Sequence, residues 1–386
     1  MSNFTKRLII TLVIGLLVVG CQPAASSRQA VMYRGDGQRT GVFDTQGVHQ
    51  LSGALWQFKT GGPVWSSPVV AGGVIYFGSD DHFFYAVDAQ TGQEKWRFET
   101  GDDVRSSPAI ADGIVYFRSY DNYLYAVDAQ SGQLVWKANL VDISLDKAQW
   151  LPREQYDDFI SSPLVANGMV YVGGYFNIFA LDARTGQEKW RFRGTYALRA
   201  TPAISGDTLY FGGLNDLTAV DAKTGQERWT FKAQGDVPYA PAVGDDGVVY
   251  FGSKDAHLYA VDGRTGELKW KMNPTNGTSW VSSSPALFNG VVYAGTSMAA
   301  SLHAVRMDTG QQAWRFKTRG WVWSSPAIAD GVAYIGSGDK YLYAVDVQTG
   351  QELWNFKTGG SVYSSPVVAD GVVYFGSLDG TVYALH

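Results

Sequence analysis

The chain has 386 residues, of which 45% are hydrophobic, 14% aromatic and 17% charged, and its formal net charge at pH 7 is −5. Such a composition is typical of a globular protein with enough apolar material for a large core. Because phosphate neutralisation supplies most nucleic-acid affinity, a mildly acidic chain without a basic run is not expected to bind nucleic acid.

The N-terminal residues predict a secretion signal. A short basic stretch with Lys6 and Arg7 precedes an apolar run, LIITLVIGLLVV, at residues 8–19. Twelve apolar residues are too few to span a bilayer and match the core of a signal peptide. The run ends in VVGC, in which Cys21 is the only cysteine of the chain, so no disulfide can form within it.

This order of features resembles the bacterial lipoprotein box, in which cleavage before the cysteine is followed by lipidation of its thiol. An ordinary secretory signal with an incidental cysteine is the alternative. We predict a signal peptide at 1–20, followed at 21–31 by a lipidated Cys21 and a polar tether that anchors the chain to a membrane. Gln22 stands where the resemblance associates an aspartate with inner-membrane retention. The expected location is therefore the outer membrane, facing the periplasm, or the cell surface.

A tryptophan then recurs along the chain at intervals of 40, 40, 54, 39, 41, 44 and 40 residues. A near-constant period of this length predicts a repeat architecture. The repeats contain alternating, β-branched and aromatic runs without helical periodicity, which predicts strands. The eight positions are Trp56, Trp96, Trp136, Trp190, Trp229, Trp270, Trp314 and Trp354.

The first repeat divides into four strands, which we name A to D. They are VWSSPVV at 64–70, VIYFGS at 74–79, FFYAVDA at 83–89 and QEKWRFE at 93–99. Four short antiparallel strands in forty residues are typical of a propeller blade. Between strands A and B, two adjacent turn residues that tolerate positive φ predict a tight type I′ hairpin. These pairs are Gly72–Gly73, Asp112–Gly113, Asn167–Gly168, Asp246–Gly247, Asn289–Gly290, Asp330–Gly331 and Asp370–Gly371.

The two ends of the repeat region complement each other. The last repeat stops at His386 after three strands, and the missing D strand, GALWQFKTG, lies at 53–61, ahead of the first A strand. We therefore predict an all-β, eight-bladed, monomeric propeller at 53–386 whose last blade is closed by an N-terminal strand. Closure removes two exposed strand edges, which would otherwise promote aggregation. Residues 32–52 are expected to form an ordered lead-in segment.

The repeats resemble the PQQ-like (quinoprotein-type) propeller repeat, whose motif is Ala-x-Asp-x-x-Thr-Gly-x-x-x-Trp. Residues 86–96, AVDAQTGQEKW, fit this motif, and the copy at 304–314 departs from it because Arg306 replaces the aspartate. The resemblance implies that the eight tryptophans dock neighbouring blades together, a structural role and not a cofactor-binding one.

A candidate partner or ligand face carries the D-to-A and B-to-C connections, where the repeats differ most. The residue before the Ser-Ser pair of strand A is expected to line the mouth of the axial channel. Aromatic side chains with two arginines there suit an anionic or planar ligand, and side chains that only plug the channel are the alternative. Arg118 adds a cation where the first repeat has Gly78. The eight positions are Trp65, Arg105, Ile160, Arg199, Pro238, Ser282, Trp323 and Tyr363.

The same face carries an inserted D-to-A loop at 137–159. Its Trp150 and Tyr156 are candidate partner contacts, because loops on rigid scaffolds often carry function; packing on the chain's own propeller is the alternative. The B-to-C turns share an aspartate, for which local hydrogen bonding is favoured over metal binding. These aspartates are Asp81, Asp121, Asp255, Asp339 and Asp379.

A lipid-anchored PQQ-like propeller of this length resembles the outer-membrane protein assembly factor BamB family, which implies a non-enzymatic scaffold that binds another envelope protein. One alternative is a quinoprotein dehydrogenase, whose pyrroloquinoline quinone lies beside a disulfide of adjacent cysteines, above a calcium ion and a catalytic aspartate. This chain lacks the second cysteine. We therefore predict no catalytic, cofactor-binding or metal-binding residue. A ligand-binding or surface-adhesion propeller is the other alternative.

Overall fold

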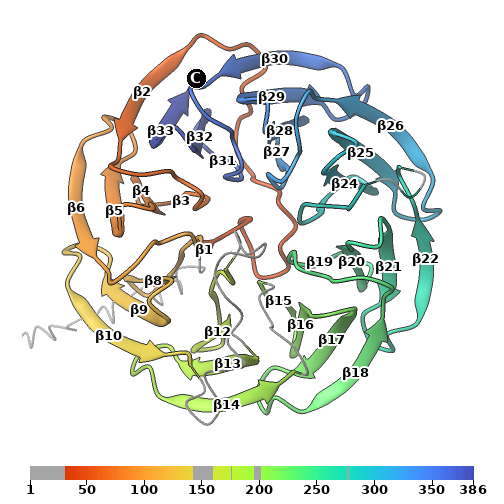
Figure 1. Cartoon of the computed structure of the whole chain (residues 1–386), viewed down its shortest axis with the longest axis horizontal. Coiled ribbons are helices and arrows are strands. Elements are labelled where there is room, and N and C mark those ends of the chain that lie inside the picture. Colours follow the sequence, from red (N-terminus) through yellow and green to blue (C-terminus); the bar gives the residue numbers. More distant parts are fainter. Residues whose placement is uncertain (1–30, 142–159, 175, 195–200, 276, 278) are drawn as a thin grey trace, which may run out of the picture.

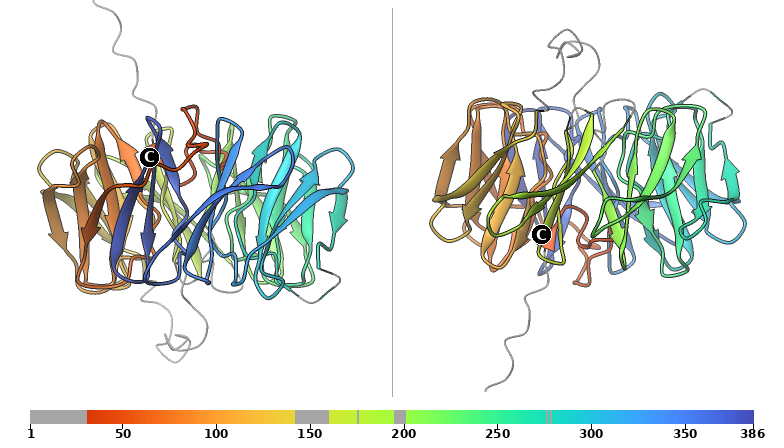
Figure 2. Two further views of the ribbon diagram at one scale, coloured as in Figure 1. Left: turned by 90° about the horizontal axis from the view of Figure 1, so that it is seen from above. Right: turned by 90° about the horizontal axis from the view of Figure 1, so that it is seen from below.

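The computed structural model describes residues 31–141, 160–174, 176–194, 201–275, 277 and 279–386. In these residues every regular element is a β-strand, and none forms a helix long and apolar enough to cross a membrane. Eight antiparallel sheets surround one axis (Figure 1), and Figure 2 shows that they form a single disc with the connections on its two faces. The predicted eight-bladed propeller is confirmed.

Each blade runs from a short strand at the axis to a long strand at the rim (Figure 1). Blades 1 to 4 comprise β3 Val69–Ala71, β4 Val74–Gly78, β5 Phe83–Asp88 and β6 Glu94–Glu99; β7 Ala109–Ala111, β8 Ile114–Arg118, β9 Tyr123–Asp128 and β10 Leu134–Asn139; β11 Leu164–Ala166, β12 Met169–Gly173, β13 Asn177–Asp182 and β14 Glu188–Arg193; and β15 Ala203–Ser205, β16 Thr208–Gly212, β17 Asp216–Asp221 and β18 Glu227–Lys232.

Blades 5 to 8 comprise β19 Ala242–Val243, β20 Val248–Gly252, β21 Leu258–Asp262 and β22 Leu268–Met272; β23 Ala286–Phe288, β24 Val291–Thr296, β25 Ser301–Arg306 and β26 Gln312–Lys317; β27 Ala327–Ala329, β28 Val332–Gly336, β29 Tyr341–Asp346 and β30 Glu352–Lys357; and β31 Val367–Ala369, β32 Val372–Ser377, β33 Thr381–Leu385 and β2 Ala54–Lys59. Strand β1, Val31–Met32, adds a fifth strand to blade 2.

The core lies between neighbouring blades. The B and C strands are almost fully buried, whereas the D strands alternate between exposed and half-buried residues because only one of their faces meets a neighbour. Aromatic rings fill the interface, as where Phe84 of blade 1 stacks on Phe117 of blade 2 with centroids 3.9 Å apart. Burial between sheets therefore accounts for the β-branched and aromatic residues of each repeat.

The A-to-B hairpins match the prediction in six of the seven pairs. Both turn residues have positive φ there, as at Asp112 (50°) and Gly113 (78°). The prediction is wrong at Asp246–Gly247, where only Gly247 has positive φ, 75°. The Gly247 N–H donates to the Gly244 carbonyl at 2.9 Å. The extra residue Asp245 lengthens this loop, so that a wider turn replaces the two-residue hairpin and ends at Gly247.

Blade 8 closes the ring. Strand β2 pairs antiparallel with β33, with Trp56 opposite Ala384 and Lys59 opposite Thr381. The His386 carbonyl also accepts a hydrogen bond from the Ser52 N–H at 2.6 Å, just ahead of β2. This pairing confirms the predicted closure by an N-terminal strand.

The recurring tryptophans join each outer strand to the next blade. Each indole Nε1–H donates to a backbone carbonyl beyond its own blade at 2.7–3.1 Å. Seven of the rings lie against the turn glycine of the next blade, so that a Cβ on Gly132 would lie 2.7 Å from the Trp96 ring. Trp354 bonds Val48 of the lead-in segment at 2.7 Å, because the chain ends before blade 8 can form that turn.

The lead-in segment does more than precede the propeller, because it crosses the axis (Figure 1) and pairs with the inner strands. Residues 31–32 bond β7, and the carbonyls of Gly37, Gln38, Thr40 and Gly41 accept N–H bonds of 2.7–2.9 Å from blades 4, 5, 6 and 7. Inner strand edges that would otherwise be unpaired are thereby satisfied. We expected only an ordered lead-in here, because the segment has no periodicity to indicate its path.

Two buried arginines hold the lead-in segment in the axis. The Arg39 guanidinium is fully buried and donates to the carbonyls of Pro163 (3.2 Å) and Pro202 (3.1 Å). Arg34 is 5% exposed and donates to the carbonyls of Pro285 and Pro326. Burial lowers the pKa of Arg39 to about 9, and the side chain remains charged at neutral pH. Charge-assisted bonds to four blades therefore fix the segment.

Deleting residues 53–61 should destabilise the protein by more than about 3 kcal/mol, the lower end of the loss for truncating one buried aromatic residue, because Trp56 and a whole strand pairing disappear. Thermal denaturation and size-exclusion chromatography should show a lower melting temperature and aggregation through the exposed β33 edge. A deletion of equal length in the tether, 22–30, should leave both unchanged. A 53–61 deletion that melts like the parent would contradict closure.

Gly132→Ala and Gly113→Ala form a matched pair that isolates the tryptophan contact. Both glycines have positive φ, 70° and 78°, but only Gly132 lies against an indole; a Cβ on Gly113 meets nothing within 4 Å. Gly113→Ala should cost about 1 kcal/mol of unfolding free energy, and Gly132→Ala about 1–3 kcal/mol more. Equal losses in denaturant titrations would show that the glycine is needed only for its backbone conformation.

Candidate functional site

An open cavity lies at the axis, on the face with the D-to-A and B-to-C connections. Tyr33 of the lead-in segment reaches its inner end and donates from its hydroxyl to Ser325 Oγ at 3.0 Å. The structure brings six of the eight positions before the Ser-Ser pair to this cavity. They are Trp65, Arg105, Ile160, Pro238, Trp323 and Tyr363.

Aromatic rings form a continuous row along one side of the mouth. Trp321 lies 4.9 Å from Trp323, Trp323 lies 4.7 Å from Tyr363, and Tyr363 lies 5.3 Å from Trp65, measured between ring centroids. Trp321 is 44% exposed. Because mutual stacking restricts each ring, the row presents apolar surface with little conformational entropy left to lose on binding.

Arg105 ends this row, and its charge is already compensated. Its guanidinium lies 5.0 Å from the Trp65 ring centroid and makes two bonds of 2.9 Å to the carboxylate of Asp80. Asp103 Oδ2 lies 3.6 Å from Arg105 Nη2. Asp80, from the B-to-C turn, and Asp103, two residues before Arg105, therefore remove the spare positive charge that we expected for an anionic ligand.

The structure places Arg118 away from the cavity. The side chain is 6% exposed, and Nη1 donates to the Gly173 carbonyl of blade 3 at 2.7 Å. At Gly78, the equivalent position of blade 1, a Cβ would lie 2.3 Å from the Val104 carbonyl. The residue type at this position therefore follows the fit between blades, which the sequence pattern alone did not reveal.

The remaining predicted residues fall into two groups. Ser282 is fully buried and donates to the Val322 carbonyl at 3.1 Å, so it does not reach the cavity. Cys21, Trp150, Tyr156 and Arg199 lie outside the described residues, and their roles stay predictions.

A belt of hydroxyl groups surrounds the cavity, and sequence reasoning missed it. In six blades the second serine of the Ser-Ser pair, or the threonine at the same position, accepts a hydrogen bond from the equivalent N–H of a neighbouring blade, as from Ser67 N–H to Ser107 Oγ at 3.0 Å. The sequence does carry a signal for this belt, because a serine or threonine recurs at one position of each blade. Among the described copies, only Ala240 departs from this pattern. Further acceptors are Ser162, Thr201, Ser325, Ser365 and Ser67.

The five B-to-C aspartates hold neighbouring segments together. Asp81 Oδ2 accepts from the Gly61 N–H and the Tyr85 hydroxyl, each at 2.7 Å, and the other four make the same two kinds of bond. Burial alone would raise the pKa of Asp255, but hydrogen bonds, first that from Tyr259, lower it below its ordinary value. Oδ1 of each aspartate also accepts the N–H two residues further on, as from Phe83 N–H to Asp81 Oδ1 at 3.1 Å, and this confirms the predicted local hydrogen bonding.

The family model described as outer membrane protein assembly factor BamB matches residues 46–149, 150–229, 176–320 and 299–386. The chain belongs to this family. A search of curated proteins found no match.

Solved structures share the fold. BamB from Moraxella catarrhalis is 20% identical with a TM-score of 0.70, and the match covers 86% of this chain and 97% of that one. A europium-containing methanol dehydrogenase is 16% identical (TM-score 0.72; 92% and 97% covered). Quinohemoprotein alcohol dehydrogenase from Comamonas testosteroni is 17% identical (TM-score 0.75; 92% and 80% covered). At these identities the likeness shows the fold alone.

The described lining of the cavity lacks the groups that the resemblance implies for a quinone with calcium. The resemblance to quinoproteins implies a vicinal disulfide and carboxylates that bind the ion and the substrate. The chain has one cysteine, and no aspartate or glutamate is among the described residues that line the cavity. Burial raises the pKa of Tyr239, so this lining phenol stays a neutral hydroxyl.

Asp80→Asn should lower the unfolding free energy by about 2 kcal/mol, because it leaves the half-buried Arg105 without its bidentate partner. Asp236→Asn is the control: Asp236 pairs with Lys254 at 3.1 Å on the same face, but both side chains are about 30% exposed. That change should cost no more than about 1 kcal/mol. Equal losses in urea titrations would show that the Asp80–Arg105 pair stabilises no more than a surface pair.

Proposed function

We propose that the protein is a non-catalytic, lipid-anchored scaffold that binds another envelope protein, as a BamB-type factor of outer-membrane protein assembly. Lipidation of Cys21 would hold it at the outer membrane, or at the cell surface, with the propeller outside the cytoplasm. Membership of the BamB family supports the proposal.

The aromatic row at the mouth is the observation that carries this proposal. Tryptophan and tyrosine are frequent binding hot spots, and here they are held in place by stacking. Trp280, 39% exposed, occupies the position equivalent to the 44% exposed Trp321 in a neighbouring D-to-A loop. Large apolar groups exposed on one face of a rigid scaffold are typical of a protein-binding surface.

Trp321→Ala should reduce recovery of the partner in pull-downs from detergent-solubilised membranes by about tenfold or more, the effect of losing a binding hot spot of about 2 kcal/mol. The wild-type chain should recover barrel-assembly components. Leu268→Ala is the matched control, because Leu268 is 46% exposed but lies on the outer strand β22. This variant should recover as much of the partner as the wild type does. Recovery of barrel-assembly components that is equal for both variants would place the partner elsewhere on the propeller; recovery of only sugars or unrelated surface proteins would favour an adhesion module.

The alternative of a quinoprotein dehydrogenase draws support from the shared fold of two such enzymes. It predicts that the purified chain, supplied with pyrroloquinoline quinone and calcium, reduces a dye when an alcohol is added. We expect no reduction, since the chain has one cysteine and the described lining of the cavity has no carboxylate. Turnover in this assay would overturn the scaffold proposal.

A further inference from the structure

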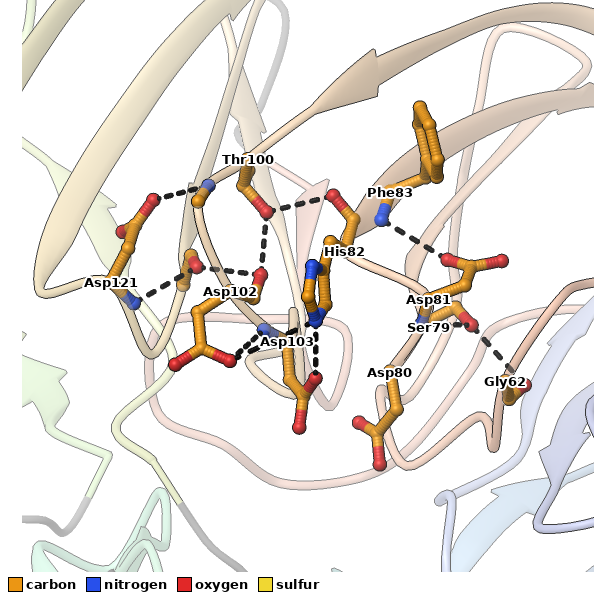
Figure 3. A network of polar contacts seen from close by, with 12 residues as sticks. Gly62, Ser79, Asp80, Asp81, His82, Phe83, Thr100, Asp102, Asp103 and Asp121 are labelled. Carbon is orange, nitrogen blue, oxygen red and sulfur yellow. Dashed lines mark hydrogen bonds and ion pairs between the residues drawn. The ribbon is translucent and has the colours of Figure 1, made fainter.

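Three side chains of metal-ligating type converge beside the cavity mouth (Figure 3). His82 lies in the B-to-C turn of blade 1, and Asp102 and Asp103 lie in the loop from β6 to β7. His82 Nε2 is 3.3 Å from Asp103 Oδ1 and 4.0 Å from Asp102 Oδ1. One donor atom from each residue lies within 4.8 Å of the others.

The two backbone segments are fixed independently of these side chains. Thr100 Oγ1 lies 2.8 Å from the His82 carbonyl oxygen and 2.6 Å from the Asp102 carbonyl oxygen, and its single hydroxyl proton is shared between these two acceptors (Figure 3). The turn and the loop are therefore held side by side, and the three donors need only rotamer changes to converge further.

The other repeats serve as an internal comparison. The positions equivalent to His82 and Asp103 hold Asn215 with Asp236, Ala256 with Trp280, Ala300 with Trp321, Lys340 with Ser361 and Gly380 with Pro63. Among these described copies, only blade 1 combines an imidazole with two carboxylates. Because the other turns fold with quite different residues, the propeller itself does not require this combination.

The donor atoms of the cluster are directed at one another. Asp103 Oδ1 lies toward His82, and Asp103 Oδ2 lies 3.6 Å from Arg105 Nη2. Asp102 Oδ1 accepts the Asp103 N–H at 2.8 Å, which holds this carboxylate beside the histidine. A carboxylate oxygen has lone pairs for both a hydrogen bond and a metal ion.

We propose that His82 Nε2 and the carboxylates of Asp102 and Asp103 bind a divalent first-row transition metal ion, best represented by Zn²⁺. One imidazole with two carboxylates suits zinc, whereas calcium and magnesium prefer oxygen ligands alone. The His82 side chain is 51% exposed, so solvent can reach the site. Three protein ligands leave a coordination position for water or for a partner's side chain. The ion joins the blade 1 turn to the loop that leads into blade 2.

The test is calorimetric titration of the full chain with Zn²⁺ after treatment with a chelator. The wild type should bind one ion per chain, and His82→Ala should weaken binding by about 100-fold or more, since even losing an outer partner of a metal ligand costs 10–100-fold. His49→Ala is the matched control, because His49 Nε2 faces a single carboxylate, Asp330 Oδ2, at 3.1 Å. That variant should bind as the wild type does.

A second readout uses stability. Zn²⁺ should raise the melting temperature of the wild type and of His49→Ala, but not of His82→Ala or Asp103→Asn, and Mg²⁺ should raise none of them. Circular dichroism of the variants without metal checks that they fold. No binding by the wild type, or binding that His82→Ala leaves unchanged, would reduce the cluster to a histidine–carboxylate ion pair. Both experiments use the purified chain and metal ions without any partner protein, so their outcomes do not depend on the proposed scaffold function.

Discussion

The pairing of β2 with β33 is the constraint on which the rest of the structure depends. An eight-bladed ring is stable only if its first and last blades meet, and here the chain supplies the last outer strand from its N-terminal side. The same arrangement places Val48 where Trp354 needs an acceptor, so that the tryptophan contact continues across the chain ends. The lead-in segment pairs with the inner strands of blades 2, 4, 5, 6 and 7, and β2 gives blade 8 the outer strand that every other blade has.

Closure of the ring produces a rigid frame. The candidate binding surfaces on this frame are built from residues that differ between the repeats. The tryptophan contacts, the hydroxyl belt and the aspartate bonds recur from blade to blade and hold the ring. The aromatic row and the His82 cluster each interrupt this regularity at particular blades of the same face. Because the lead-in segment crosses the axis and its arginines bond four blades, the cavity keeps a fixed inner end. Binding surfaces on such a frame need little reorganisation.

Much of the fold could be predicted from the sequence because each repeat signals its own turns and strands. The period of the tryptophans was enough to predict the number of blades, and the three-strand last repeat was enough to predict that an N-terminal strand closes the ring. The path of residues 31–48 could not be predicted, because backbone carbonyls and buried guanidinium groups hold it, and neither leaves a periodic pattern. For the candidate site, Trp65, Trp323 and Tyr363 reach the cavity together. The charge state of that site was not predictable, since Asp80 and Arg105 meet only in the folded ring.

Native-state hydrogen exchange measured residue by residue tests the account most directly, because it reports whether β2 belongs to the cooperative ring. If the ring depends on this pairing, the hydrogen-bonded amides of Ala54–Lys59 should exchange as slowly as those of the outer strand β6, through global unfolding alone. Rapid exchange in Ala54–Lys59 while β6 and the other blades stay protected would show that the ring is stable without its closing strand, and would contradict the account.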